Sequence, residues 1–192
     1  MRDTTIRGAG RLRAWAPVAM ASLLLPVSGC VMQSTYNNML QQQQSIEAAL
    51  RSEINADQVE IEQLQNGIRV RMSSDLLYRE GGVELSEPGR AALNKVAPQL
   101  SGQGDQIDVT GNTDNVPVGP GLAGRFPTNW ELGGARAAIV VRTLQAAGVD
   151  PTAMRAVSAG QYHPVASNDT PQGRAKNRNT EILLRPMGSS PQ

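Results

Sequence analysis

One carboxylate and one guanidinium flank a Gly/Pro-rich stretch in the second half of the chain. Asp114 follows a predicted strand at 106–110, and Arg136 lies two turns inside a predicted helix at 129–147. A guanidinium grips a carboxylate through two parallel hydrogen bonds, and a carboxylate pairs with an ammonium. If the fold brings the two side chains together, they form a receptor for a ligand that carries both an ammonium and a carboxylate.

The composition indicates one ordinary domain with appendages and argues against several functions. The chain has 192 residues and is 40% hydrophobic, which suffices for one core. Its 18 basic and 17 acidic residues nearly balance, so the chain lacks the excess positive charge of a nucleic-acid-binding protein. An aromatic content of 3% argues against a surface on which bases stack. Cys30 is the only cysteine, so neither an internal disulfide nor a cysteine metal cluster is expected. We therefore expect no nucleic-acid partner and no cofactor.

The N-terminus has the features of an export signal. Four arginines precede the apolar run 14–27, which is shorter than the about 20 residues of a membrane span, so a signal peptide over 1–29 is predicted. Its end, Val27-Ser28-Gly29-Cys30, resembles the lipobox of bacterial lipoproteins, which implies cleavage before Cys30 and acylation (palmitate included) of that residue. The alternative is an ordinary signal peptide with a buried thiol nearby. Val31, rather than Asp, after the cysteine suggests the outer membrane by analogy with lipoprotein sorting.

Residues 30–67 are predicted to be a helical spacer behind the lipidated cysteine. Between Leu40 and Ile68 there is no proline, and a helix over 36–66 would reach about 45 Å. Polar residues interrupt the heptad seam, which leaves two interpretations open. The segment is a solvated helix that leans on the domain, or residues 40–68 form a weak coiled coil for a homodimer or an envelope-complex partner. The seam residues are Leu40, Glu47, Ile54, Ile61 and Ile68.

Strands alternate with helices from Ile68 onward, which predicts an α/β (α+β) two-layer sandwich with a mixed sheet over 68–186 and a loose tail at 187–192. The expected elements are strands at 68–72, 106–110, 154–159 and 180–184, a helix after Ser86, and helices at 129–147 and 170–177.

Three sequence blocks in this domain occur in an order that resembles a known family. The blocks are Thr110-Gly111-Asn112-Thr113-Asp114, Phe126-Pro127-Thr128-Asn129-Trp130-Glu131-Leu132 with Ala135-Arg136-Ala137, and Gly173-Arg174-Ala175-Lys176-Asn177-Arg178. They resemble the C-terminal peptidoglycan-binding domain shared by OmpA, MotB and Pal, over roughly residues 68–185. The second block and the loop before it are most similar to MotB.

The resemblance implies non-covalent binding of the peptidoglycan stem peptide. The α-amino acid head of diaminopimelate would lie between Asp114 and Arg136. Asn129, with loop N–H groups, would add donors, although Asn129 or Thr128 serves equally well as a helix N-cap. Two further residues, Thr113 and Arg178, are predicted to complete the site. Arg174 is expected to be a solvated surface arginine.

Three positions depart from the family pattern. Asn112 stands where the family usually has histidine, and Gly133 stands where it has serine. Asn179 replaces the second arginine of the last block. The first two changes concern supporting roles. The third leaves open whether the C-terminal wall of the site still contributes to binding.

The sequence offers no enzymatic alternative of comparable strength. His163 has no nucleophile placed with it, and Glu131 lies in a first helical turn, where the dipole explains an acid. We therefore predict a lipid-anchored tether on the periplasmic face of the outer membrane. A second hypothesis is an accessory subunit of a stator or secretion apparatus. A third is an interaction module that no longer binds the wall.

Overall fold

The computed structural model describes residues 27–80, 82–101 and 104–186. The side chains of residues 27–33 and 35 are outside this description, as are residues 1–26 and 187–192. The predicted signal peptide therefore lies outside the described residues except for 27–29, and so do the Cys30 side chain and the predicted tail. No helix in the described ranges is long and apolar enough to cross a membrane.

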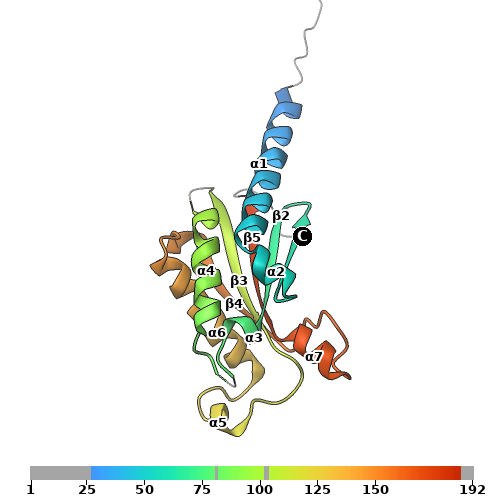
Figure 1. Cartoon of the computed structure of the whole chain (residues 1–192), viewed down its shortest axis with the longest axis vertical. Helices are drawn as coiled ribbons and strands as arrows, with labels where there is room; N and C mark the ends of the chain where they lie inside the picture. Colours follow the sequence, from blue (N-terminus) through green and yellow to red (C-terminus); the bar gives the residue numbers. More distant parts are fainter. Residues whose placement is uncertain (1–26, 81, 102–103, 187–192) are drawn as a thin grey trace, which may run out of the picture.

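A five-stranded mixed sheet forms the centre of the molecule (Figure 1). Its strand order is β1-β2-β5-β3-β4, with β3 and β4 parallel and every other neighbouring pair antiparallel. The predicted two-layer mixed α/β architecture is confirmed. The strands are β1 Val59–Leu64, β2 Gly67–Ser73, β3 Asp105–Asn112, β4 Met154–Gly160 and β5 Asn179–Pro186.

Two long helices, α4 and α6, cover one face of the sheet, and each begins at a hydroxyl cap. Ser86 caps α4 by accepting a hydrogen bond from the Gly89 N–H, as the sequence predicted. Thr128 caps α6, and Thr170 caps α7. The helices of the domain are α3 Ser74–Leu77, α4 Glu87–Leu100, α5 Pro120–Ala123, α6 Asn129–Ala146 and α7 Pro171–Asn177, with a 3-10 turn at Pro151–Ala153.

The two faces of the sheet have different chemistry. Along β2, Ile68, Val70 and Met72 are buried against the helices, and the residues between them point outward. On the outer face, Arg69 lies 2.8 Å from Glu62 and 3.1 Å from Glu181. Such ion pairs satisfy the charges of a solvated face but contribute little net stability. The core therefore lies on the helical side of the sheet.

The predicted helix over 36–66 is wrong from residue 56 onward. The helices are α1 Val27–Ala49 and α2 Arg51–Asn55, and residues 59–64 form β1 instead of continuing the helix. Asp57 adopts a positive φ of 55°, which ends the helical path. The segment after it alternates apolar and acidic residues and pairs with β2. Over a stretch as short as 59–64, the apolar positions fit both a helical heptad and an alternating strand. The pairing with β2 decides in favour of the strand.

The C-terminal half of α1, together with Leu50 directly after it, is part of the domain core. Ile46 and Leu50 are fully buried in the same cluster as the sheet residues. The Gln42 side chain donates to the Gln99 carbonyl at 3.1 Å and to Asp105 at 2.9 Å. Of the two interpretations of the spacer, the structure favours a helix that leans on the domain. Figure 1 shows α1 projecting from one end of the molecule and α5 lying at the opposite end.

The connection from β3 through α6 to β4 places the loop after β3 next to the start of α6. A crossover is required because β3 and β4 are parallel. At Gly111, an added Cβ would lie 2.0 Å from the Gly133 carbonyl oxygen, so only glycine permits this close approach of helix and strand. As a result Asp114 and Arg136 are held at the same end of the sheet.

Candidate functional site

A cavity of about 600 Å³ opens at the end of β3. All five residues that the sequence predicted for the site line it: Thr113, Asp114, Asn129, Arg136 and Arg178. The opposite wall is apolar and comes from the loop around α5, with Val116, Pro117, Val118, Pro120 and Leu122. The cavity therefore combines a charged floor with an apolar side, which suits a ligand that has a charged head and an aliphatic chain.

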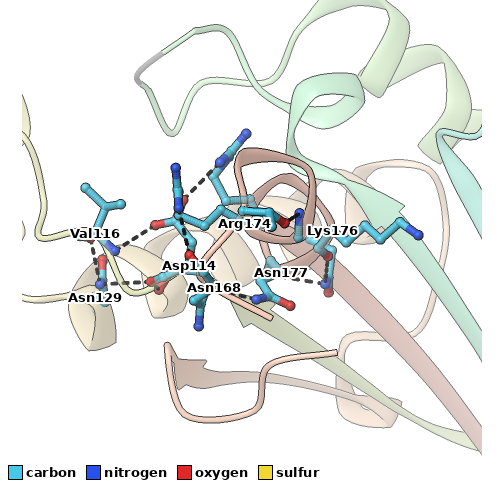
Figure 2. A network of polar contacts seen from close by, with 12 residues as sticks. Asp114, Val116, Asn129, Asn168, Arg174, Lys176 and Asn177 are labelled. Atoms are coloured by element: carbon cyan, nitrogen blue, oxygen red, sulfur yellow. Dashed lines mark hydrogen bonds and ion pairs between the residues drawn. The ribbon is translucent and has the colours of Figure 1, made fainter. Parts of the chain in front are cut away.

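The Asp114 carboxylate is buried, with 7% of the residue exposed. One oxygen accepts a hydrogen bond from Arg178 Nη1 at 2.9 Å, and the other accepts from the Val116 N–H at 3.0 Å. Figure 2 shows Asp114 and Val116 within a wider polar network. Each carboxylate oxygen has two lone pairs, so Asp114 retains acceptor capacity for a ligand ammonium.

The Arg136 guanidinium is held without a carboxylate partner among the described residues. It is 8% exposed, and its Nε and Nη2 donate to the Gly82 carbonyl at 3.3 and 3.0 Å. Its guanidinium carbon lies 4.9 Å from the centroid of the Tyr78 ring. Burial lowers the pKa of Arg136, and the nearby Tyr78 and Asp114 groups oppose that shift. A buried arginine in this state is prepared to accept a carboxylate from a ligand.

Thr128, and not Asn129, caps helix α6. The Thr128 hydroxyl accepts from the Trp130 N–H at 3.2 Å, and Glu131 accepts from the Thr128 N–H at 2.8 Å. This reciprocal pair is a capping box. Hydrogen bonds from Thr128 lower the pKa of the exposed Glu131. Glu131 is therefore a capping residue, as its place in the first turn suggested.

Asn129 shapes the cavity by joining two loops. Its Nδ2 donates to the Asp114 carbonyl at 3.2 Å, to the Val116 carbonyl at 3.0 Å and to Gln161 Oε1 at 2.8 Å. Figure 2 shows Asn129 beside Val116 and Asp114. Because protein acceptors already use both of its N–H groups, Asn129 positions the Asp114 loop.

Thr113 and Arg174 serve as supports for the cavity wall. The Thr113 N–H donates to the Gly160 carbonyl at 2.8 Å, and its hydroxyl donates to the Asp114 carbonyl at 2.9 Å. Arg174 was expected to be solvated, but it lines the cavity and donates to the Asn168 carbonyl at 2.7 Å. In Figure 2 it lies among the residues of this network. No sequence signal distinguished it from a surface arginine.

Comparison with known proteins identifies the domain. The model of the OmpA family matches residues 77–178, which is more than half of the chain. The chain belongs to the OmpA family. Peptidoglycan-binding members of this family are not enzymes, in agreement with the predicted binding role. No group of three or more metal-ligating side chains occurs in the part of the chain that the structure describes.

Relatives of this chain include a peptidoglycan-binding protein and a probable lipoprotein. The peptidoglycan-binding protein ArfA of Mycobacterium tuberculosis is 34% identical over 122 residues, which are 63% of this chain and 35% of ArfA. The probable lipoprotein YiaD of Escherichia coli is 30% identical over 142 residues, which are 73% of this chain and 62% of YiaD. The matched segments thus span less than two thirds of these relatives.

Solved structures in the family share the fold. A MotB-like protein from Desulfovibrio vulgaris superimposes with a TM-score of 0.72 at 23% identity, over 81% of this chain and 99% of that one. The cell wall anchor of the T6SS from Pseudomonas aeruginosa superimposes with a TM-score of 0.67 at 30% identity, over 73% of this chain and 96% of that one. The expected resemblance to MotB is confirmed at the level of the fold.

Two of the three departures from the OmpA-family pattern contact each other. Asn112 Nδ2 donates to Asn179 Oδ1 at 2.9 Å, and both residues are buried. Asn179 Nδ2 donates in turn to the Lys176 carbonyl at 2.8 Å. The pair of amides joins β3 to β5 below the cavity. The missing arginine is therefore replaced by a satisfied neutral contact, and Arg178 supplies the positive charge beside Asp114.

The third departure, Gly133, has a steric reason. A Cβ at this position would lie 2.6 Å from Ser158 Oγ and 2.7 Å from the Gly111 carbonyl oxygen. The Ser158 hydroxyl, on β4, occupies the space and donates to the Trp130 carbonyl at 2.7 Å. A side chain at position 133 would therefore clash with the strand that faces the helix.

Sequence reasoning missed the residues that hold Arg136 in place. Tyr78 and Gly82 precede Arg136 by more than 50 positions, and Gly82 contributes only its backbone carbonyl. Gln161, which bonds Asn129, likewise comes from the loop after β4. A backbone acceptor leaves no signature in side-chain chemistry, so only the fold reveals these contacts.

The buried Tyr78 phenol is expected to lower the free energy of unfolding at alkaline pH. Burial raises its pKa to about 12, although the Thr180 hydrogen bond and the Arg136 charge oppose the shift. The folded state therefore favours the neutral phenol. This stabilisation is complete below the unfolded pKa near 10 and is lost as pH rises from about 10 to 12, by roughly 3 kcal/mol in total.

Urea unfolding at pH 9 and pH 11.5 tests this, with Tyr78→Phe as the comparison. We expect the parent to lose more stability than the variant between the two pH values. Phenylalanine keeps the ring under Arg136 but loses the 2.8 Å contact with Thr180, at a cost of about 1 kcal/mol at pH 9. An equal loss of stability in both proteins would show that ionisation of Tyr78 is not its cause.

Proposed function

We propose that this protein binds the diaminopimelate-containing stem peptide of peptidoglycan without covalent chemistry. The observation that carries the proposal is that Asp114 and Arg136, both buried, line one cavity. Asp114 would accept the ammonium of the diaminopimelate head, and Arg136 would donate to its carboxylate. The name of the relative ArfA supports the same ligand class.

The shape of the cavity supports an α-amino acid head on an aliphatic chain. The Asp114 oxygens and the Arg136 guanidinium are fixed by protein hydrogen bonds before a ligand arrives. Preorganised groups lose little entropy on binding. Val118 and Leu122 lie in the apolar wall, where the methylene groups of diaminopimelate would pack.

We further propose that Cys30 carries lipid and that the protein tethers the outer membrane to the wall. α1 contains Cys30 and leaves the domain at the end opposite α5, whose loop lines the cavity (Figure 1). From Cys30 to its end at Ala49, α1 is about 30 Å long. A lipid attached there would place the cavity away from the bilayer. The probable lipoprotein YiaD among the relatives supports an anchor of this kind.

Co-sedimentation tests wall binding. The chain from Val31, without lipid, is mixed with purified sacculi whose stems contain diaminopimelate, and with sacculi whose stems contain lysine. We expect the protein to pellet with the first and not the second, because lysine stems lack the free amino acid head. Free meso-diaminopimelate should release it. A protein that stays in solution with both preparations would contradict the proposal.

Membrane attachment is tested separately. Growth with labelled palmitate should label the parent and leave Cys30→Ser unlabelled, and the variant should leave the outer-membrane fraction. Label on neither protein would contradict the lipid anchor and leave wall binding unaffected.

A second candidate function is a wall anchor for a larger envelope machine. The likeness to the cell wall anchor of the T6SS supports it, together with the exposed stretch of α1 at residues 36–38. Substituting Tyr36, which is exposed, should then weaken co-purification of a partner without changing sacculus binding. If the protein is a tether only, substitution at Tyr36 should change neither the co-purification of a partner nor sacculus binding.

A further inference from the structure

Two aromatic side chains stack on each other at the protein surface. The ring centroids of Trp130 and Tyr162 lie 5.2 Å apart, and the angle between the ring planes is 26°. Trp130 is 46% exposed and Tyr162 is 62% exposed. The whole chain has only two tryptophans, three tyrosines and one phenylalanine. Two of these few aromatic residues exposed side by side indicate a surface that is used for binding.

The aromatic pair is held in a fixed position. The Trp130 carbonyl accepts a hydrogen bond from Ser158 Oγ at 2.7 Å. Gly160 has a positive φ of 54°, and a Cβ there would lie 3.3 Å from the Trp130 ring, so the ring lies against the backbone. The Tyr162 N–H donates to the Ala159 carbonyl at 3.2 Å. Groups that are positioned in advance lose little entropy when a ligand binds.

The pair lies directly outside the cavity that contains Asp114. Trp130 follows Asn129, which lines this cavity. Tyr162 follows Gln161, whose Oε1 accepts a hydrogen bond from Asn129 Nδ2 at 2.8 Å. Consecutive Cα atoms are only about 3.8 Å apart. A ligand that fills the cavity and extends past Asn129 would therefore meet the aromatic pair.

The size and chemistry of the pair favour a small uncharged ring over a protein partner. An aromatic side chain buries up to about 250 Å², so the exposed parts of the two residues offer roughly 250 Å². A stable protein partner needs about 800 Å² on each side. Within the described residues, no hydrogen bond occupies the Trp130 Nε1–H or the Tyr162 hydroxyl. The pair thus suits a ligand with one apolar face and a polar rim.

We propose that Trp130 and Tyr162 bind a pyranose ring of the peptidoglycan glycan strand. One face of a pyranose presents C–H groups that pack on aromatic rings, and its hydroxyl and acetamido groups can bond the two polar ends of the pair. The choice of this sugar rests on the proposed function, because the stem hangs from N-acetylmuramic acid. Only two amino acids separate diaminopimelate from that sugar, and they extend to roughly 10 Å. The sugar is therefore kept near the mouth of the cavity.

Titrations with matched ligands, followed by calorimetry and tryptophan fluorescence, test the proposal. The chain from Val31 keeps every buried residue of the described core, and Trp130 is its only tryptophan because Trp15 is absent from it. The ligands are the tripeptide L-alanyl-γ-D-glutamyl-meso-diaminopimelate, the same tripeptide on N-acetylglucosaminyl-N-acetylmuramic acid, and this disaccharide alone. We expect the disaccharide-tripeptide to bind about tenfold more tightly than the tripeptide, as aromatic stacking does in other complexes. It should also shift the Trp130 emission to shorter wavelength, because the sugar displaces water from the ring.

Two variants locate the effect on the aromatic pair. Trp130→Ala and Tyr162→Ala should each lower the affinity for the disaccharide-tripeptide to about that for the tripeptide, and should leave the affinity for the tripeptide unchanged. The matched control is Tyr36→Ala, which removes an exposed aromatic ring from α1 and should bind all ligands like the parent. An equal loss of affinity for both peptides in the two variants would make the pair a structural support of the cavity and overturn the proposal.

Failure of the sugar subsite and failure of the proposed function give different results. If the parent binds both peptides with the same affinity and its emission does not respond to the disaccharide, the subsite is wrong and the proposed function stands. If the parent binds none of the three ligands, both are wrong. A change of oligomeric state in the aromatic variants, with sugar binding intact, would make the pair a contact between copies of the chain and would also overturn the subsite.

Discussion

Arg136→Ala and Asp114→Asn are each expected to lose binding to diaminopimelate-type sacculi, by about 30-fold or more. Each change removes one charge of the buried receptor and leaves its counterpart in the bound ligand unpaired, which costs about 2–5 kcal/mol. Asparagine at 114 retains an acceptor for the Val116 N–H and so isolates the effect of the charge. Arg136→Lys keeps the charge but not the two-pronged donor, and should bind with intermediate strength.

The control for these variants is Arg142→Ala, on the same helix and exposed. Melting temperatures must accompany the binding data, because Arg136 also contacts the Gly82 carbonyl and the Tyr78 ring. Folded Arg136 and Asp114 variants that still pellet with sacculi at the affinity of the parent would exclude this cavity as the wall site.

Leu50→Ala and Ile46→Ala should each destabilise the domain by about 2–5 kcal/mol. Both side chains are fully buried in the core cluster that contains the sheet residues. A spacer helix that merely connected lipid and domain would tolerate either change. Removing residues 27–56 altogether should prevent folding of the remainder, because three buried side chains, those of Met39, Ile46 and Leu50, are then missing from the core.

Urea unfolding monitored by circular dichroism measures both effects. The matched control is Leu40→Ala, on α1 like Ile46 but only half-buried, for which a much smaller change is expected. If the alanine variants at 46 and 50 unfold at the same urea concentration as the parent, α1 docks too weakly to belong to the core.

Helix α1 would also connect the proposed lipid anchor to the domain core. The residues that lead back to Cys30 continue a helix whose C-terminal half is packed on the sheet. The anchor would then be joined to the domain through a short rigid rod rather than through a flexible linker, and the orientation of the cavity relative to the membrane would be restricted.

Much of the site was predictable because side-chain chemistry and local spacing determine it. Asp114 at the end of a strand and Arg136 two turns into a helix follow from the pattern of apolar residues around them. Thr113, Asn129 and Arg178 followed from the family resemblance, and all five residues line one cavity. The cap at Ser86 was predictable for the same local reason, since a hydroxyl before a first-turn proline satisfies orphan N–H groups.

Other features depended on contacts between segments far apart in the chain. The sequence by itself determined the alternation of strands and helices, the charged residues and the order of the three blocks. The tertiary structure alone decided that residues 59–64 form a strand, because they pair with β2. It also decided that Asn112 and Asn179 satisfy each other, and that the Gly82 carbonyl holds Arg136. Hydrogen bonds between distant backbones have no local period, so no pattern within one segment can reveal them.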